Sequence, residues 1–296
     1  MTLHCLFHAD DFALNTLCSN GIISGLSAKR LHSTSILIGG ADQSNFDKLK
    51  AAEPLFIHVH LNLLEGKALT DGGADIGLTT QDGFFCLTMF QLISKLRTDF
   101  RKKHIKKWIE NEFFCQIETV YKHFPSYKIR LDGHLHIHIL PELRSIMINI
   151  AQKLPIDYIR IPHEYSYCNS ANITNTLKGN FRRKVLSFWA KGLYRRLHSY
   201  DVKTSDYFLG STASCHLTLK DIDRGLEKIR KKAAGRNVVV EIMTHPIGIG
   251  ENNPDFYKDS HYHFAHNTKA RHHELDMLLS DELISILKKN DGVLYS

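Results

Sequence analysis

Five short stretches of the chain each end an apolar, strand-like run with acidic, histidine or arginine side chains. They lie far apart in the sequence and cover residues 6–11, 56–60, 131–138, 158–162 and 240–246. A parallel barrel gathers the carboxyl ends of its strands at one face, and its active sites lie there. The five stretches therefore predict strand ends that converge on one functional site.

The apolar runs between these points alternate between strand-like and helix-like patterns. Strands are expected over residues 3–9, 33–38, 55–61, 128–138, 158–161, 202–208, 238–244 and 292–295. The segments between them are long enough for crossover helices, which predicts parallel strand pairing. We therefore expect one α/β domain over residues 1–296, an irregular TIM-like (β/α) barrel. An open, doubly wound sheet is the alternative, although no glycine-rich phosphate-binding fingerprint supports it.

The bulk composition limits the class of protein. The 296 residues are 43% hydrophobic and 23% charged, which suits one large folded domain rather than a disordered chain. No stretch has the length and apolar character of a membrane-spanning helix, and no secretory signal is recognised. The six cysteines are irregularly spaced, which favours reduced thiols over a disulfide framework. These features predict a cytoplasmic protein.

The net charge of +7 is concentrated in basic clusters at residues 101–107 and 182–196. Such runs are usually solvated helix faces. Residues 180–197 also carry bulky apolar side chains, which is typical of a crossover helix packed on a barrel. An interfacial helix that touches anionic lipid has the same composition, so peripheral contact with the inner face of a membrane is a second hypothesis. No nucleic-acid-binding motif accompanies the charge, and we expect no nucleic-acid partner.

The densest group of polar residues is Asp132, His134, His136 and His138, which alternate with apolar residues. If the strand continues to residue 138, all four side chains share one face. A carboxylate and three imidazoles on one face are typical of a metal or catalytic site. Because a strand rises about 3.3 Å per residue, the four cannot all bind one ion. His134 is the first choice as ligand, and His136 and His138 are expected to support it or to face the substrate.

Two other strand ends offer further ligands. His58 and His60 form an H-x-H pair on one side of their strand, and Asp10 and Asp11 are adjacent carboxylates where the chain turns. One carboxylate can bind a metal while the other acts on water. Repulsion between them would raise one pKa unless a metal offsets it. The alternative is structural, with Asp10 as a helix cap.

The last two strand ends carry groups that can move protons and bind charge. His245 lies just before Pro246, where the chain must leave its strand, and is well placed as a general acid. Arg160 can pair with a carboxylate or with a developing oxyanion. A structural histidine and a salt bridge at the barrel rim are the alternatives.

Taken together, these stretches resemble the YdjC-like carbohydrate deacetylases, a family that includes chitooligosaccharide deacetylases. The resemblance covers nearly the whole chain and keeps the order of the family's motifs. It rests on HADDF at 8–12, HLNLLEG at 60–66, DGHLHIHILP at 132–141, RIP at 160–162 with Glu164, DYFLG at 206–210, EIMTHP at 241–246, and Arg271 with Glu274 and Leu275.

This resemblance implies an irregular (β/α) barrel that removes an acetyl group from an N-acetylated sugar with one divalent metal ion, Mg²⁺ or Zn²⁺. By analogy the metal would be held by Asp11, His60 and His134. The catalytic residues would be Asp10 as general base, His245 as the acid that protonates the leaving amine, and Arg160, which would orient Asp10. The expected substrate-binding residues are His136, His138, Asn62, Glu65 and Asp206.

Three positions depart from the family pattern. Ala13 stands where the family usually has glycine after D-D-F, His8 replaces a usual asparagine, and His58 replaces a usual glycine. The imidazole of His58 is therefore a secondary candidate for the metal.

Two other functions remain as alternatives. A barrel phosphoesterase or amidohydrolase also uses H-x-H strands, usually with more ligands and often with two metals. A basic, non-enzymatic surface-binding protein would need none of this chemistry. For the deacetylase, the basic and apolar stretch at 180–197 suggests a lipid-linked or surface-polysaccharide sugar, and the sequence leaves a homodimer open.

Overall fold

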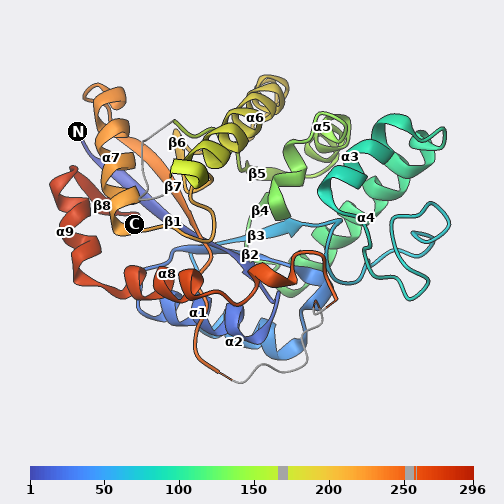
Figure 1. Cartoon of the computed structure of the whole chain (residues 1–296), viewed down its shortest axis with the longest axis horizontal. Helices are drawn as coiled ribbons and strands as arrows, with labels where there is room; N and C mark the ends of the chain where they lie inside the picture. The colour runs from blue at the N-terminus through green and yellow to red at the C-terminus, as the bar shows by residue number, and fades with distance from the viewer. Residues whose placement is uncertain (166–172, 251–256, 258) are drawn as a thin grey trace.

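The fold is built on a sheet of eight parallel strands (Figure 1). The computed structural model describes residues 1–165, 173–250, 257 and 259–296. The strands are β1 (Leu3–Phe12), β2 (Ser33–Ile36), β3 (Phe56–Leu61), β4 (Ile129–Gly133), β5 (Ile156–Ile159), β6 (Tyr207–Leu209), β7 (Val238–Thr244) and β8 (Gly292–Leu294). Their order is β5-β4-β3-β2-β1-β7-β6, and β8 pairs with the first residues of β1. The predicted α/β class with parallel pairing is confirmed.

The sheet curls until its two edge strands, β5 and β6, approach each other. Among the described residues, two isolated parallel bridges cross this seam, Tyr158 with Lys203 and Glu164 with Phe208. No continuous ladder joins β5 to β6 within the described part of the chain, because β6 begins only at Tyr207. The fold is thus a curled, half-barrel parallel sheet. The predicted irregular TIM-like barrel is confirmed as far as its parallel α/β character, and a full TIM barrel is not confirmed.

Helices cover the outer surface of the sheet. They are α1 (Thr16–Ser27), α2 (Gln43–Ala51), α3 (Met89–Thr98), α4 (Lys102–His123), α5 (Arg144–Lys153), α6 (Ile173–Leu197), α7 (Leu219–Ala233), α8 (Lys269–Leu279) and α9 (Asp281–Lys289), with short 3₁₀ turns η1 (Ile38–Gly40), η2 (His134–Ile139) and η3 (His263–Ala265). Figure 1 shows α1, α2 and α8 on one side of the sheet and α5 and α6 on the other. These helices cover the apolar outer face of the sheet. Polar side chains of the strands therefore gather on the inner face of the curled sheet.

Strand β1 shows how alternation separates the core from the site. Phe7 and Ala9 are fully buried in the main hydrophobic cluster. His8 and Asp10 point to the other side, where His8 contacts Ser33 of the neighbouring strand β2 and Asp10 contacts Arg160, the residue after β5. Because side chains alternate along a strand, one strand serves both the core and the polar interior.

The strand predicted over residues 128–138 ends at Gly133, so that prediction is wrong beyond this residue. The chain continues as η2, in which Leu135 and His136 adopt positive φ values of 49° and 61°. A Cβ atom at residue 133 would lie 2.8 Å from Nδ1 of His138, so glycine allows the turn to fold back onto the strand end. The three histidines of this segment therefore do not share a strand face.

Gly133→Ala is expected to lower the free energy of unfolding by about 1–3 kcal/mol, the usual cost of overpacking. The added Cβ would meet His138 at 2.8 Å and the carbonyl oxygen of Leu61 at 3.2 Å, and the second contact is with a backbone atom of β3. Backbone strain is not the cause, because Gly133 has an extended conformation with φ −165°. Urea denaturation measures the change, and an unaltered midpoint would show that η2 can shift at no cost.

Candidate active site

Five strand ends bring buried polar side chains together at the carboxyl edge of the sheet. They come from β1, β3 and β4, from the residue after β5 and from the residue after β7. The side chains are Asp10, Asp11, His60, Asp132, Arg160 and His245, together with His134 at the start of η2, and each residue is at most 7% exposed. The convergence expected from the sequence is therefore present in the structure.

Asp11, His60 and His134 form a group with the spacing of a metal site. One ligand atom from each lies within 4.8 Å of the others. Oδ1 of Asp11 is 3.6 Å from Nε2 of His60 and 3.2 Å from Nδ1 of His134. Two imidazoles and a carboxylate are a donor set that zinc and similar divalent ions accept.

The orientation of His60 supports this interpretation. Its Nδ1 lies 2.7 Å from Oδ1 of Asp132. Burial alone would raise the pKa of Asp132, but Arg160 and the neighbouring histidines hold it well below its usual range, so the ionised carboxylate can only accept a hydrogen bond from Nδ1–H of His60. In neutral His60 the lone pair then lies on Nε2, which faces the carboxylates of Asp11 and, at 4.0 Å, Asp10. A cation between these acceptors would relieve their repulsion, and a carboxylate behind a ligand histidine is typical of metal sites.

His134 fits the same site, but it must give up a proton to bind metal. Its Nε2 lies 2.5 Å from Glu65, and its Nδ1 faces Asp11. Burial lowers the pKa of His134, but Glu65 and Asp11 outweigh this effect and raise it to about 10. Metal binding at Nδ1 would therefore compete with protonation.

Arg160 is the centre of charge compensation at the site. The side chain is fully buried, and it donates from Nη1 and Nη2 to the two oxygens of Asp10, both at 2.8 Å. Its Nε donates to Glu241 at 2.7 Å, and Nη2 lies 3.1 Å from Asp132. Burial raises the pKa of Asp10, with Arg160 acting against the shift. The two-pronged contact with Arg160, which we call the fork, fixes the orientation of the Asp10 carboxylate. Because burial raises its pKa, Asp10 is a stronger base than an exposed aspartate.

His245 is held through its backbone rather than its ring. Its N–H donates to Glu274 at 2.5 Å, and its carbonyl accepts from Nε of Arg271 at 2.9 Å. Nη2 of Arg271 also donates to Oδ2 of Asp11 at 3.0 Å, so one arginine links His245 to a proposed ligand. Nδ1 of His245 is buried and has no hydrogen-bond partner among the described residues, and burial lowers the pKa of the imidazole to about 3.

The sequence did not assign roles to Arg271, Glu274 and Glu241. The motifs of the resemblance contain all three, but their spacing from the strand ends gives no sign of what they contact. Glu274 is fully buried, and burial raises its pKa to about 7. Its two backbone partners, the N–H groups of His245 and Leu217, show that it positions the loop after β7.

Asn62 and Glu65 are at the site, but both support other residues instead of facing an open surface. The side chain of Asn62 bonds to the backbone of Leu64 and Glu65, which closes the turn after β3. Glu65 is 1% exposed and contacts His134, Ser260 and His266. Burial raises its pKa, but His134 and His266 overcome this effect and lower it to about 2.

The other three predicted substrate-binding residues lie in different places. His138 is fully buried, and its Nε2 is 2.9 Å from the carbonyl oxygen of Arg160. His136 is 6% exposed, with its ring 6.1 Å from that of Phe208. Asp206 is not brought to the site: its carboxylate accepts from the N–H of Val239 at the start of β7, whereas the site lies beyond the other end of that strand. The structure therefore does not bring Asp206 together with the other predicted substrate-binding residues, and its role in substrate binding stays a prediction.

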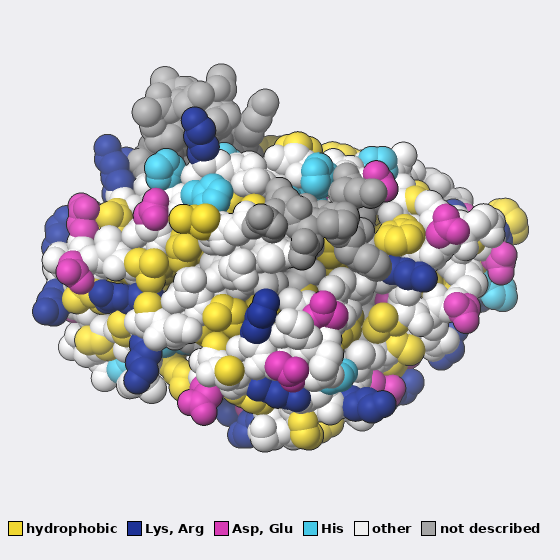
Figure 2. All heavy atoms as spheres, turned by 90° about the horizontal axis from the view of Figure 1, so that it is seen from below, with side chains coloured by type: hydrophobic (Ala, Val, Ile, Leu, Met, Phe, Trp, Pro, Cys, Tyr) yellow, Lys and Arg dark blue, Asp and Glu magenta, His cyan; other side chains and the backbone are white. Residues whose placement is uncertain are grey.

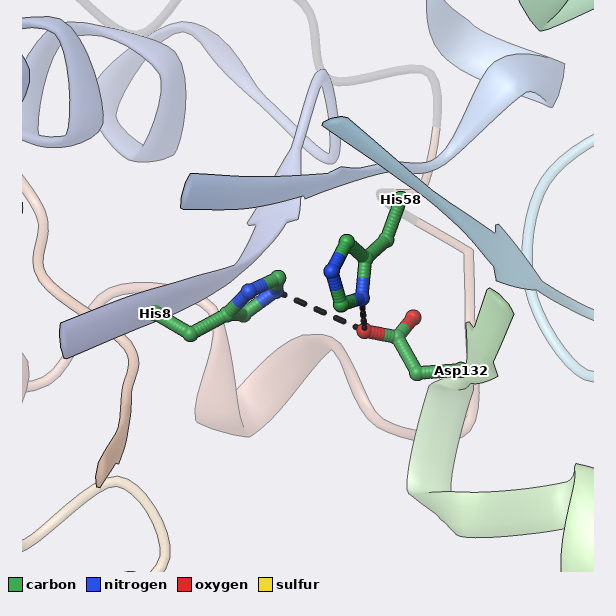
Figure 3. A group of neighbouring side chains, drawn as sticks. All are labelled: His8, His58 and Asp132. Carbon is green, nitrogen blue, oxygen red and sulfur yellow. Dashed lines mark hydrogen bonds and ion pairs between the residues drawn. The ribbon is translucent and has the colours of Figure 1, made fainter. Parts of the chain in front are cut away.

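His8 and His58 form a second layer with Asp132 beneath the site. Figure 3 shows both rings directed at the same carboxylate oxygen, from β1 and β3. The group has ligand-like spacing, but both ring nitrogens of His8 already contact hydroxyl groups, Ser33 at 2.7 Å and Ser35 at 2.5 Å. We interpret this layer as hydrogen-bonded support for Asp132. The two departures from the family pattern thus lie against each other, with ring centroids 4.4 Å apart.

The third departure, Ala13, adopts a φ of 68° in the turn after β1. This is the left-handed region that favours glycine, which explains why glycine is usual at this position. Alanine keeps the same turn here, and its N–H donates to the hydroxyl of Ser19 at 3.1 Å.

A curled parallel sheet with carboxylates and imidazoles at its carboxyl strand ends has the arrangement in which parallel-barrel enzymes carry their active sites. The chain belongs to the YdjC-like protein family, whose family model matches residues 5–289.

Several relatives are named carbohydrate deacetylases. One from Danio rerio is 24% identical and covers 96% of this chain and 94% of its own length. One from Homo sapiens is 25% identical and covers 80% of this chain and 73% of its own length. One from Vibrio cholerae is 29% identical and covers 50% of this chain and 55% of its own length.

The fold also matches a crystal structure from Enterococcus faecalis V583, that of a proposed cellobiose-phosphate cleavage protein. The match covers 100% of this chain and 98% of that chain, with a TM-score of 0.69 and 19% sequence identity. That likeness supports the fold.

Proposed function

We propose that this protein is a metal-dependent carbohydrate N-deacetylase, which hydrolyses the acetamide of an N-acetylated oligosaccharide, polysaccharide or lipid-linked glycan. One observation carries the proposal: Asp132 accepts a hydrogen bond from Nδ1 of His60, which leaves the Nε2 lone pair facing the carboxylates of Asp11 and Asp10. Membership of the YdjC-like family and the names of the relatives support the choice of reaction.

Asp11, His60 and His134 would hold the ion. Two nitrogen donors and one oxygen donor suit Zn²⁺ better than Mg²⁺, which prefers oxygen ligands. A divalent ion bound there supplies polarisation of the acetyl carbonyl and lowers the pKa of water. Glu65 and Asp132 orient the two histidines from behind.

Asp10 is the proposed general base. Its raised pKa favours proton uptake, and the fork of Arg160 holds its oxygens in a fixed direction. Arg160 acts through Asp10 and is a positioning residue.

His245 is the proposed acid for the leaving amine. Its pKa of about 3 means that the imidazole is neutral at pH 7 in the resting site, with a proton on only one ring nitrogen. It must therefore receive the proton during the reaction before it passes it to the amine nitrogen. Its unpartnered Nδ1 shows that no protein group already occupies that position among the described residues.

The second candidate function is a two-metal phosphoesterase or amidohydrolase. The His8, His58 and Asp132 group favours it, because its ligand atoms also lie within 4.8 Å of one another. The serine partners of His8 weigh against it.

Metal content and acetate release test the proposal together. The protein should bind one divalent ion per chain, and chelated protein should release acetate from N-acetylglucosamine oligosaccharides or lipid-linked sugars only after metal is added back. His60→Ala should lose the ion and the activity, whereas His58→Ala should keep most of the bound metal. Two ions per chain with phosphate release would favour the second candidate, and a folded protein that binds no metal would favour a non-enzymatic role.

A further inference from the structure

Helix α6 carries an exposed stripe of aromatic and basic side chains. Phe181 is 72% exposed and Phe188 is 75% exposed, which is unusual for phenylalanine. The exposed residues Lys184, Lys191 and Arg195 complete the set, which we call the α6 stripe. The spacing i, i+3, i+7, i+10 and i+14 places all five within about 80° of the helix circumference.

The opposite face of α6 is already used for packing. Leu186, Ala190, Leu193 and Leu197 are buried, and they lie on the far side of the helix from the stripe. This face packs against α5 and η2, the segment that begins at His134. The helix is thus a crossover helix, as the sequence favoured, and its other face leaves two phenylalanines and three basic side chains exposed.

The charge of α6 has one sign. The helix contains no acidic residue, and no ion pair to Lys184, Lys191 or Arg195 is found within the described part of the structure. Figure 2 shows a different face of the molecule, on which basic and acidic side chains are intermixed. Within the described residues, the three cations of the α6 stripe therefore have no acidic ion-pair partner.

We propose that the α6 stripe binds the surface of an anionic lipid bilayer. Phenylalanines between lysines and an arginine fit such a surface, because the rings enter the headgroup region while the cations remain beside the lipid phosphates. A solvated helix face would explain the charges but would gain nothing from two exposed phenylalanines on the same line. The structure has no described helix that is long and apolar enough to cross a membrane, so the contact would be peripheral.

The inference is independent of the deacetylase proposal. Because α6 packs on η2, a bilayer on the stripe would lie about one helix diameter, roughly 10 Å, from the segment that carries His134. That position would suit a sugar attached to a lipid, which is the one part of the inference that rests on the proposed function.

Vesicle flotation tests the stripe directly. The wild-type chain should float with vesicles of phosphatidylglycerol and phosphatidylcholine in 50 mM NaCl, and should float far less with phosphatidylcholine alone or in 500 mM NaCl. Phe181→Ser with Phe188→Ser should lower the partition coefficient at least tenfold. Each of Lys184→Gln, Lys191→Gln and Arg195→Gln should lower it about fivefold, the equivalent of about 1 kcal/mol per cation.

Phe264→Ser is the matched control, since Phe264 is 78% exposed on η3, a turn without lysine or arginine. It should bind vesicles like the wild type. Phe100→Ser tests the rival surface, because Phe100 is 91% exposed beside the basic start of α4. If Phe100→Ser lowers flotation and the stripe variants do not, the proposal is wrong.

Equal flotation of the stripe variants and the wild type, or binding that ignores lipid charge, would also overturn it. The proposal is also wrong if the wild type does not float with vesicles but is retained on immobilised RNA. Circular dichroism and acetate release from a water-soluble sugar separate these outcomes from misfolding and from failure of the deacetylase proposal, because the stripe variants should change neither.

Discussion

Arg160→Met is expected to lower the free energy of unfolding by about 3–5 kcal/mol at pH 7, the range for removing one partner of a buried ion pair. The guanidinium is fully buried and contacts the carboxylates of Asp10, Asp132 and Glu241. Methionine fills much of the volume but leaves these carboxylates without their cation. Urea denaturation followed by tryptophan fluorescence and circular dichroism measures the loss.

The pH dependence of this loss has a definite sign. Arg160 helps to hold the pKa of Asp132 well below its usual range, so this group contributes stability above the unfolded pKa of about 3.9 that is lost as the pH falls. The variant lacks that contribution. The part of the difference that comes from Asp132 should therefore be complete at pH 7, begin to shrink only below about pH 3.9, and disappear as the pH falls through the lower pKa of folded Asp132.

Two further variants control the result. Arg230→Met removes a partly exposed cation that lies 3.5 Å from Asp291, and should change stability by no more than about 0.5 kcal/mol. Arg160→Lys keeps the charge but not the two-pronged contact with Asp10, so it should recover only part of the stability. A cost for Arg160→Met as small as that for Arg230→Met would show that water or another cation already compensates the carboxylates.

Asp10→Asn is expected to reduce kcat by about 10²- to 10⁴-fold, the usual contribution of a general base, while the protein keeps its metal. Asparagine preserves the size of the side chain and still accepts a hydrogen bond from Arg160, but it cannot take a proton from water. Acetate release and metal content per chain are measured on the same sample.

Asp11→Asn is the matched variant, one residue away on the same strand end. It should lose most of the bound metal, because Asp11 lies between His60 and His134. Asp10 also belongs to a group with metal-like spacing, together with His60 and Asp132. If Asp10→Asn lost the metal and Asp11→Asn kept it, the roles of base and ligand would have to be exchanged.

The alternation of apolar residues along the sequence predicted the bounds of a strand well where that strand pairs regularly with its neighbours. The strand expected over 238–244 is β7, Val238–Thr244, because its apolar run is buried between β1 and β6. β1 was expected to end at residue 9 but continues to Phe12, which pairs with Ile36 after a register shift. The strand expected over 202–208 is only Tyr207–Leu209, since residue 203 makes one isolated bridge. Such differences arise from the partner strand, which a local pattern does not contain.

The sequence by itself determined the α/β class, the family and the residues that end the strands at the site. Strand alternation and turn residues act over a few positions, so Asp10, Asp11, His60 and Arg160 could be recognised from their immediate neighbours. Only the tertiary structure decided what these residues contact. Asp132 contacts His60, His58 and Arg160, which lie 72, 74 and 28 residues away in the sequence. Arg271 contacts Asp11, 260 residues away. Asp206 lies at the edge of the sheet opposite the site. Contacts over such separations depend on how the sheet curls, and no local periodicity records them.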